Sequence, residues 1–198
     1  MRYSHILGVD EAGRGPLAGP VAVGVVKVAG NFDIKKAFPD ANDSKQLSER
    51  MRETVYAEMK ARKKAGEIDF CVRFSSAKLI DAIGITRAVR RGVWGGVRAL
   101  APEPALAFVK LDGLLRAPGE YAQETIIKGD ALEPVISLAS IAAKVERDRL
   151  MKKLARIYPG YFLEEHKGYG TKKHYEMIEQ RGPTDIHRMT FLSLTTRK

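Results

Sequence analysis

Cysteine, side-chain amides and long apolar runs are scarce in this sequence, and each scarcity excludes a class of protein. Cys71 is the single cysteine of 198 residues, so no internal disulfide can form, and its alternating surroundings favour a strand residue over a nucleophile. No stretch reaches the roughly 18–20 apolar residues of a membrane span, and charge and glycine interrupt the first residues too early for a signal peptide. We therefore expect a soluble, cytoplasmic protein. Two Asn and three Gln weakly suggest adaptation to heat.

Positive charge is in excess. Lysine and arginine number 34 against 24 acids, which gives a formal net charge of +10. Such a balance is typical of a partner dense in phosphate. The basic residues are spread over most of the chain, however, and part of the excess is ordinary solvated helix surface. Charge alone leaves a nucleic-acid partner and a merely basic surface equally open.

Five short segments have the composition of strands. Residues 5–10 and 20–30 are rich in β-branched side chains and bounded by glycine and proline, which predicts buried strands. Residues 67–76 alternate between apolar and polar side chains. Residues 105–113 and 122–130 are expected to be strands that end in acids.

Helical periodicity fills the intervals between these strands. We expect helices over residues 43–66, 75–100, 137–160 and 171–182. Asp43 or Ser44 can cap the first helix, and Thr171 caps the last, which Gly182 follows. Strands and helices interleave without a linker or a repeat, which predicts one α/β domain over residues 1–198, with a helical C-terminal extension from about 160 to 198.

Three acids share one setting. Asp10, Asp112 and Asp130 each close an apolar run, and Glu11 follows the first of them. Ligands of open α/β sheets bind beyond the carboxyl ends of strands, so these side chains are expected to converge on one cleft. Asp10 and Glu11 can face one site only if the chain leaves the strand between them. Each acid alone has an alternative role as a turn residue.

Clustered carboxylates need a cation between them, because they otherwise raise one another's pKa. Ligand sets made only of oxygen suit Mg²⁺ or Mn²⁺ rather than zinc. A basic protein with an acidic metal site has the composition of a nuclease that uses two metal ions.

The element Gly13, Arg14 and Gly15 lies directly after the first acids. Glycine lets a backbone approach a ligand closely, and arginine supplies a fork of donors. A structural turn is the alternative. The segment does not match the dinucleotide-binding fingerprint, since it lacks the third glycine and places Pro16 where the helix would begin.

The chain resembles the ribonuclease H type 2 family in its bacterial ribonuclease HII form. The resemblance rests on GVDEAGRGPLAGPV at residues 8–21, the DSK at 43–45, the LDG at 111–113, the KGD at 128–130 with the following SLASIAAKVERDR, and HKGYGTKKH with GPTDIHR near the C-terminus. These motifs occur in the family's order from about residue 6 to 192. The segments LASIAAKVERDR and GITRAV depart mildly from the family's pattern, which leaves substrate preference open.

The resemblance implies a ribonuclease H-like fold, with a mixed central sheet flanked by helices. It implies cleavage of the RNA strand of RNA–DNA hybrids and incision 5′ to ribonucleotides embedded in duplex DNA, leaving 3′-hydroxyl and 5′-phosphate ends. The family's catalytic and metal-binding acids fall on Asp10, Glu11, Asp112 and Asp130, with two Mg²⁺ or Mn²⁺ ions expected when substrate is bound.

The resemblance also implies substrate contacts. Gly13, Arg14 and Gly15 correspond to the element that reads the 2′-hydroxyl at the RNA–DNA junction. Tyr169 matches the tyrosine that packs against the sugar after the ribonucleotide; a core aromatic is its alternative. Ser44 and Lys45 are expected to contact phosphate, although Ser44 is equally well a helix cap.

Four other polar residues are weaker candidates. Asp148 and Glu146 lie in a helical motif where an ion pair on the helix surface is favoured over a metal role. His166 and His187 are not spaced with acids as a metal set, so we expect structural or phosphate-side roles.

Two competing functions remain at this stage. A junction-resolving or strand-transfer nuclease could use the same scaffold and acids, and the GRG and HKGYGT elements argue against it. A noncatalytic, basic RNA-binding protein would use the acids only as turn residues. For partners we expect a monomer that binds hybrid or ribonucleotide-containing duplex DNA and no membrane. Residues 191–198 show no clear sliding-clamp peptide, and docking onto their own domain is favoured.

Overall fold

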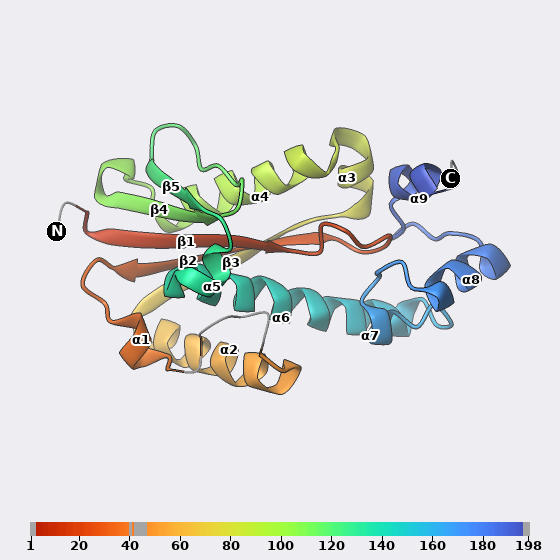
Figure 1. Cartoon of the computed structure of the whole chain (residues 1–198), viewed down its shortest axis with the longest axis horizontal. Helices are drawn as coiled ribbons and strands as arrows, with labels where there is room; N and C mark the ends of the chain where they lie inside the picture. The colour runs from red at the N-terminus through yellow and green to blue at the C-terminus, as the bar shows by residue number, and fades with distance from the viewer. Residues whose placement is uncertain (1–2, 40, 42–46, 196–198) are drawn as a thin grey trace.

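The computed structural model describes residues 3–39, 41 and 47–195. A five-stranded mixed sheet runs through the centre of the molecule, in the order β3-β2-β1-β4-β5 (Figure 1). The strands are β1 (His5–Ala12), β2 (Val21–Ala29), β3 (Ile68–Ser75), β4 (Ala107–Asp112) and β5 (Ala122–Ile126). β1 pairs antiparallel with β2 and parallel with β4; β2 and β3 are antiparallel, and β4 and β5 are parallel. The expected mixed sheet flanked by helices is confirmed.

Helices cover both faces of this sheet (Figure 1). They are α1 (Ile34–Ala37), α2 (Glu49–Lys64), α3 (Ala77–Ile83), α4 (Ile85–Leu100), α5 (Gly129–Leu132), α6 (Pro134–Ile157), α7 (Leu163–His166), α8 (Lys172–Arg181) and α9 (Met189–Thr195), with a 3₁₀ turn at Pro104–Leu106. One apolar core lies between α4 and the sheet, and a second lies between the other face and the pair α2 and α6. In the described part of the chain, no helix combines the length and the apolar character needed to cross a membrane.

Two strand glycines bring α6 unusually close to the sheet. A Cβ at Gly8 would lie 2.1 Å from the carbonyl oxygen of Val135, and a Cβ at Gly24 would lie 2.1 Å from that of Ala139. Both obstacles are backbone atoms, which cannot swing aside as a side chain can. The close approach sets the position of every side chain that α6 directs toward the end of β1.

Several element boundaries differ from those expected. α2 begins at Glu49 rather than near residue 43, because the hydroxyl of Ser48 accepts the amide of Met51 and caps it there. The single helix expected over 75–100 is two helices, α3 and α4, since Gly84 adopts φ 81° between them. α6 starts three residues before Ser137, at Pro134, a residue well suited to a first helical turn.

Other local expectations are confirmed. Thr171 accepts the amide of His174 at the start of α8, and Gly182 follows the helix with φ 76°. Cys71 lies in β3, partly buried against the core beside α4. Near the C-terminus Phe191 packs against that same core, which is the docking expected for this segment.

Candidate active site

The candidate site opens where β4 ends and β1 continues. The pairing of β1 with β4 stops at Val9, whereas its pairing with β2 runs on through Asp10 and Glu11. The two acids therefore lie inside β1, and the chain does not leave the strand between them, although a shared site had been expected to require this. Because β4 stops at Asp112, the last part of β1 lacks a neighbour on that side, and a cavity of about 430 Å³ lies there.

Asp10 and Glu11 approach this opening from opposite faces of the sheet. Strand side chains alternate, and Asp10 faces α6, where Ser140 lies, whereas Glu11 also lines a second cavity of about 400 Å³ toward α4. Asp112, at the end of β4, lines both cavities. The structure thus brings three of the four predicted acids to one opening that spans the edge of the sheet.

Asp10 is the most buried carboxylate at this opening, with 4% of its surface exposed. Burial raises the pKa of Asp10 to about 8, a hydrogen bond from Ser140 opposes the rise, and the negative charges of Glu11 and Asp112 add to it. The backbone amide of Glu11 also donates to Asp10 Oδ1 at 2.7 Å. A carboxylate in this setting needs a positive neighbour to stay charged at neutral pH.

Glu11 has such a neighbour. Burial raises the pKa of Glu11, the Arg14 guanidinium 3.4 Å from its Oε1 opposes that rise, and the charge of Asp112 increases it. Arg14 is half-exposed and lines both cavities. The GRG element therefore places its one cation beside the carboxylates, with its outer surface open to a ligand.

Asp130 is not in this group. It lies in the short helix α5 rather than at a strand end, is 1% exposed, and lines a separate small cavity beside Glu133 and Ser137. The two regions are linked, since the amide of Gly129 donates to Asp112 Oδ1 at 2.7 Å. The structure therefore brings Asp10, Glu11 and Asp112 together, and Asp130 lies apart from them.

The oxygen donors of the opening suit a hard divalent cation, and the pKa of Asp10 is raised by burial and by the negative charges of Glu11 and Asp112, both of which a bound cation would oppose. Their side chains are not arranged as a closed ligand shell: within residues 3–39, 41 and 47–195 no group of three or more His, Cys, Asp or Glu side chains is positioned to hold a metal ion. The donor chemistry fits such an ion, and the spacing is that of an open site.

Two buried arginines hold the loop that carries the GRG element. Arg147, on α6, donates to the carbonyls of Pro20 and Lys167 at 2.9 and 3.0 Å. Arg188 donates to the carbonyls of Gly13 and Arg14, both at 2.7 Å. Each guanidinium is no more than 1% exposed, and each bonds to backbone oxygen atoms. The loop conformation is therefore fixed from beneath by two charges taken out of water.

Gly13 shows why the loop needs glycine. Its φ is 87°, a conformation that side chains disfavour, and a Cβ there would lie 1.9 Å from Nε of Arg147. Gly15 also lines the main cavity, where a Cβ would come no closer than 3.9 Å to Tyr169. The first glycine is thus required by the fold, whereas the second leaves space on the open side.

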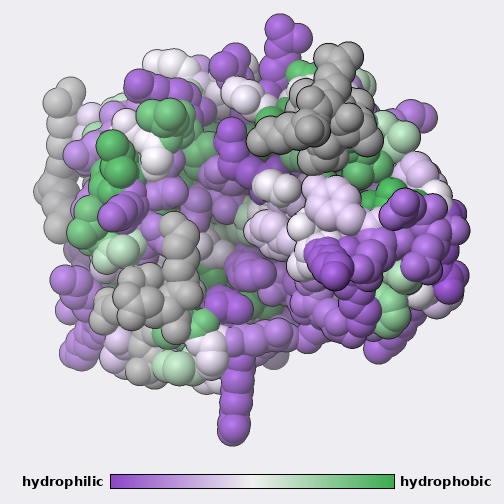
Figure 2. All heavy atoms as spheres, turned by 45° about the vertical axis from the view of Figure 1, so that its right-hand side comes forward, coloured by the Kyte–Doolittle hydropathy of each residue, from purple (hydrophilic) through white to green (hydrophobic). Residues whose placement is uncertain are grey.

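Tyr169 lies at the rim of the cavity. Its side chain is 45% exposed, so the alternative of a core aromatic is wrong, and the Arg147 guanidinium lies 5.9 Å from its ring centroid. The recess in this part of the molecule is bordered by hydrophilic side chains in the space-filling view (Figure 2). Ser44 and Lys45, the expected phosphate contacts, lie outside the described residues.

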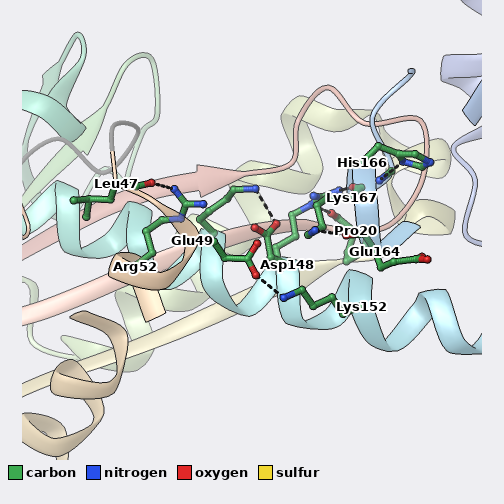
Figure 3. A network of polar contacts seen from close by, with 12 residues as sticks. Pro20, Leu47, Glu49, Arg52, Asp148, Lys152, Glu164, His166 and Lys167 are labelled. Atoms are coloured by element: carbon green, nitrogen blue, oxygen red, sulfur yellow. Dashed lines mark hydrogen bonds and ion pairs between the residues drawn. The ribbon is translucent and has the colours of Figure 1, made fainter. Parts of the chain in front are cut away.

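The weaker candidates have structural partners. Asp148 is buried and pairs with Lys144 at 2.8 Å, and Glu146 pairs with Arg149 at 3.3 Å, the ion pairs favoured from their spacing. Figure 3 shows Asp148 on α6 facing Glu49 and Arg52 of α2, with Glu49 paired to Lys152. This network joins α2 to α6 along the lower side of the cavity.

The histidines form a stacked cluster away from the carboxylates. His166 stacks on His174 at 4.3 Å, and His174 Nε2 lies 3.1 Å from His187 Nε2. Burial lowers the pKa of all three, and the pKa of His174 falls to about 4. Neutral rings that bond to backbone atoms of Tyr161, Gly168 and Thr184 are structural, as expected for His166 and His187.

Sequence reasoning missed Arg147, Arg188, Lys144 and Ser140. A signal for Arg147 existed: Ala139, Ala143, Arg147 and Met151 recur every four residues on the buried face of α6. A charged residue in an apolar row is the unusual observation that points to a buried, functional cation. Arg188 has no comparable local signal, because its partners are more than 160 residues away.

The comparisons with known proteins agree with this geometry. The model of the family described as Ribonuclease HII matches residues 7–194. The chain belongs to the ribonuclease HII family. The Ribonuclease HII of Endomicrobium trichonymphae is 43% identical over 190 residues, which cover 96% of this chain and 86% of that protein. The Ribonuclease HII of Bacillus anthracis strain A0248 is also 43% identical, over 95% of this chain and 69% of that protein.

Solved structures show the same fold. The ribonuclease H2 of Pyrococcus horikoshii OT3 superposes with a TM-score of 0.72 at 27% identity, over 94% of this chain and 93% of that one. Bst-RNase HIII, solved in complex with Mn²⁺, has a TM-score of 0.71 at 16% identity, over 100% of this chain and 72% of that one. An RNase HII from Archaeoglobus fulgidus, solved with PCNA, gives 0.73 at 23% identity, over 93% of each chain.

As a member of the ribonuclease HII family, the chain is a ribonuclease H, a hydrolase that acts on the RNA of RNA–DNA hybrids. The noncatalytic RNA-binding alternative and the junction-resolving alternative are thereby set aside. The acids at the ends of β1 and β4 line its open cavity together with four cationic side chains, Arg14, Arg52, Lys144 and Arg147.

Proposed function

We propose that this ribonuclease HII incises duplex DNA on the 5′ side of embedded ribonucleotides, in addition to cleaving the RNA strand of hybrids, and leaves 3′-hydroxyl and 5′-phosphate ends. Asp10, Glu11, Asp112 and Asp130 are the proposed catalytic acids and the ligands of two divalent cations, Mg²⁺ or Mn²⁺. The whole chain acts as one catalytic domain, with residues from about 160 to 198 as its helical extension.

One observation carries this proposal: three carboxylates and the GRG loop line the same cavity, and the Arg14 guanidinium lies 3.4 Å from Glu11 Oε1. A phosphodiester that enters the cavity meets the carboxylates of Asp10, Glu11 and Asp112 and the guanidinium of Arg14. The three carboxylates repel the phosphate, whereas Arg14, Arg52, Lys144 and Arg147, which line the same cavity, attract it. When bound, divalent cations would screen the carboxylates from the phosphate and supply an activated water.

The protein's own residues set the charge and the orientation of these carboxylates. Burial and neighbouring charge keep the pKa of Asp10 near 8, and Ser140 holds its carboxylate in place by a hydrogen bond. Arg14 favours the ionised form of Glu11. The two carboxylates are thus oriented before a ligand arrives, and Asp10 would have to be ionised to hold a divalent cation there.

Asp130 enters the proposal through Gly129. The hydrogen bond from the Gly129 amide to Asp112 connects α5 to the other carboxylates. Lys128, which directly precedes Gly129, has the left-handed conformation with φ 57°. Asp130 lines a different cavity from the other three acids, so it is the one acid of the four that must move to take part.

Substrate discrimination is assigned to the loop and to Tyr169. Gly13, Arg14 and Gly15 offer backbone groups and a guanidinium to the 2′-hydroxyl, the group that separates RNA from DNA. The exposed ring of Tyr169 offers a flat surface to the next sugar. Ser44 and Lys45 are proposed to hold phosphate at the same cleft.

The partners proposed are hybrid and ribonucleotide-containing duplex DNA, bound by a monomer. The A. fulgidus neighbour was solved with PCNA, which concerns that protein. In this chain Phe191 packs on the core, so a clamp contact through residues 191–198 would have to use the remainder of that segment.

The test uses duplexes with one, four or many ribonucleotides, each with Mg²⁺ or with Mn²⁺, and maps the cut ends. Asp10→Asn and Asp112→Asn should each lower the cleavage rate by about 100-fold or more. Hybrid binding should be kept, because each substitution removes only the charge of one carboxylate. Glu103→Gln, an exposed acid outside the cavity, is the matched control. Cutting on the 3′ side of a lone ribonucleotide, or full activity of Asp10→Asn, would overturn the proposal.

A further inference from the structure

A basic groove, separate from the two cavities of the candidate active site, lies between α4 and the edge strand β3. It has a volume of about 670 Å³, and five exposed arginines line it together with two exposed rings, Phe74 and Trp94. The arginines are Arg73, Arg87, Arg90, Arg91 and Arg98. No acidic residue is among the described residues that line it. The catalytic proposal does not use this groove.

The groove is formed by one stripe of α4. Arg87, Arg91, Trp94 and Arg98 follow one another at intervals of four, three and four residues, which places them on one face of the helix. The opposite face of α4 supplies Val89, Val93 and Val97 to the core. The arginine face is therefore fully directed outward.

These arginines differ from the other helical cations in their lack of counter-charge. On α2 and α6 the cations pair with acids, as Arg62 does with Glu58 and Arg149 with Glu53. The sequence of α4 contains no acid at all. Within the part of the chain that the structure describes, only Arg98 of the five groove arginines has an ion-pair partner, Glu120. A helix face that is exposed only to solvent would carry both positively and negatively charged side chains.

A glycine at the groove has no packing role. Gly92 and Gly96 are required, because a Cβ would lie 2.8 Å and 2.6 Å from side-chain atoms of Val23 and Val25. Gly95, by contrast, lines the groove, and a Cβ there would meet nothing within 4 Å. Glycine inside a helix costs about 1 kcal/mol relative to alanine, so an open glycine at this place suits the close approach of a ligand.

The groove continues into the active site. Arg90 lines it and also lines the cavity that holds Glu11 and Asp112. Trp94 forms the boundary between the two, since its indole N–H donates to the carbonyl of Arg116, a residue of the second cavity. A long ligand with its reacting bond at Asp112 would therefore run past Arg90 and onto the arginine stripe.

We propose that this groove binds the phosphodiester backbone of the substrate duplex away from the cleaved bond. Guanidinium forks match phosphate oxygens, and exposed rings beside them suit sugar and base surfaces. The proposal deepens the proposed function and rests on it for the identity of the ligand. An acidic protein surface is the competing occupant, and the experiment separates the two.

The experiment measures the salt dependence of binding to an RNA–DNA hybrid of about 30 base pairs, roughly 100 Å long, with a chelator present so that no cleavage occurs. Arg87→Ala/Arg91→Ala removes two charges from the stripe. Lys60→Ala/Lys64→Ala is the matched control, because it removes two exposed charges from α2, on the opposite side of the sheet. The slope of log affinity against log salt should become shallower by about 1.8 in the arginine variant alone.

Gly95→Leu tests the groove without a change in charge. It should weaken hybrid binding, whereas Gly95→Ala, which adds a single methyl group to open space, should weaken it less. Circular dichroism of both variants checks that α4 is intact. Hybrid binding by Gly95→Leu equal to that of wild type would contradict the close approach.

Equal slopes for wild type and Arg87→Ala/Arg91→Ala would overturn the proposal and favour an acidic protein as occupant. Failure of the catalytic proposal would give a different result: wild-type protein would bind the hybrid but would not cut it when divalent cations are added.

Discussion

The Arg188 guanidinium donates a hydrogen bond to the carbonyl oxygen of Gly13 at 2.7 Å, across 175 residues of chain. The same group also donates to the carbonyls of Arg14 and Gly19. Burial and, to a smaller extent, the nearby charge of Arg147 lower the pKa of Arg188 to about 9. Two like charges are thus held together out of water beneath a loop that is proposed to meet a polyanion.

Arg188→Lys is predicted to loosen this loop. A lysine ammonium cannot reach three separated carbonyls, so buried acceptors lose their partners at a cost of about 1–3 kcal/mol each. We expect a lower free energy of unfolding in urea and a lower kcat/KM on hybrid. Arg156→Lys, an exposed arginine of α6, is the control and should change neither. Unchanged stability of Arg188→Lys would show that the hydrogen bonds do not hold the loop.

The pKa of Asp10 predicts how stability varies with pH. Its carboxyl has a pKa near 3.8 when unfolded and about 8 when folded, so between these values the folded state binds more protons. Stability is then fully present below about pH 4 for this group and falls as pH rises toward 8. The loss is on the order of 5 kcal/mol, and it should be seen as a falling free energy of unfolding in a chelating buffer.

Asp10→Asn removes this dependence, because an amide does not titrate. The variant should unfold with a flatter pH profile between pH 5 and 8 and should be more stable than wild type at pH 8. Glu103→Gln provides the profile of an exposed acid. A wild-type profile that rises over this interval would contradict the raised pKa.

Local features of the sequence predicted the fold well where the physical cause was local. The cap at Thr171 and the end at Gly182 depend on neighbours within four residues, and both boundaries are correct. The continuation of β1 beyond Asp10 to Ala12 depends instead on pairing with another strand, β2, and the sequence placed the strand end too early. Boundaries set by distant partners are not visible in local periodicity.

The same distinction applies to the site. Asp10, Glu11 and Asp112 were found because acids interrupt apolar runs, and their shared cavity agrees with the expected convergence. The sequence could not reveal that both adjacent acids reach one opening although their side chains lie on opposite faces of the strand, because this follows from β4 ending early. Arg147 and Arg188 act on backbone carbonyls, which leave no pattern in a sequence.

Gly24→Ala should destabilise the protein strongly. The added Cβ would lie 2.1 Å from the carbonyl oxygen of Ala139, so α6 must move away from the sheet. Overpacking of this kind costs about 1–3 kcal/mol or more, and it displaces Ser140 from Asp10. Gly95→Ala is the informative control: it adds the same methyl group in open space and should stabilise α4 by about 0.5–1 kcal/mol. Thermal melts that moved in the same direction for both variants would contradict this account.

Tyr169 supplies a test of sugar recognition that separates its ring from its hydroxyl. The ring is 45% exposed at the cavity rim, with Arg147 beneath it. Tyr169→Phe keeps the flat surface and should retain most of the wild-type kcat/KM. Tyr169→Ala removes it, and since a stacking contact is worth about 1–3 kcal/mol, kcat/KM should fall roughly 5- to 150-fold.

The substrate comparison decides whether this loss concerns the sugar. On duplexes with one ribonucleotide, Tyr169→Ala should lose most when a deoxyribose follows the ribonucleotide, because that is the sugar the ring is proposed to contact. Tyr175→Ala, which removes an exposed ring of α8 outside the cavity, controls for the general loss of an aromatic. An equal loss on duplexes with deoxyribose and with ribose at that position would assign Tyr169 to binding alone and leave discrimination to the loop that Arg147 and Arg188 hold.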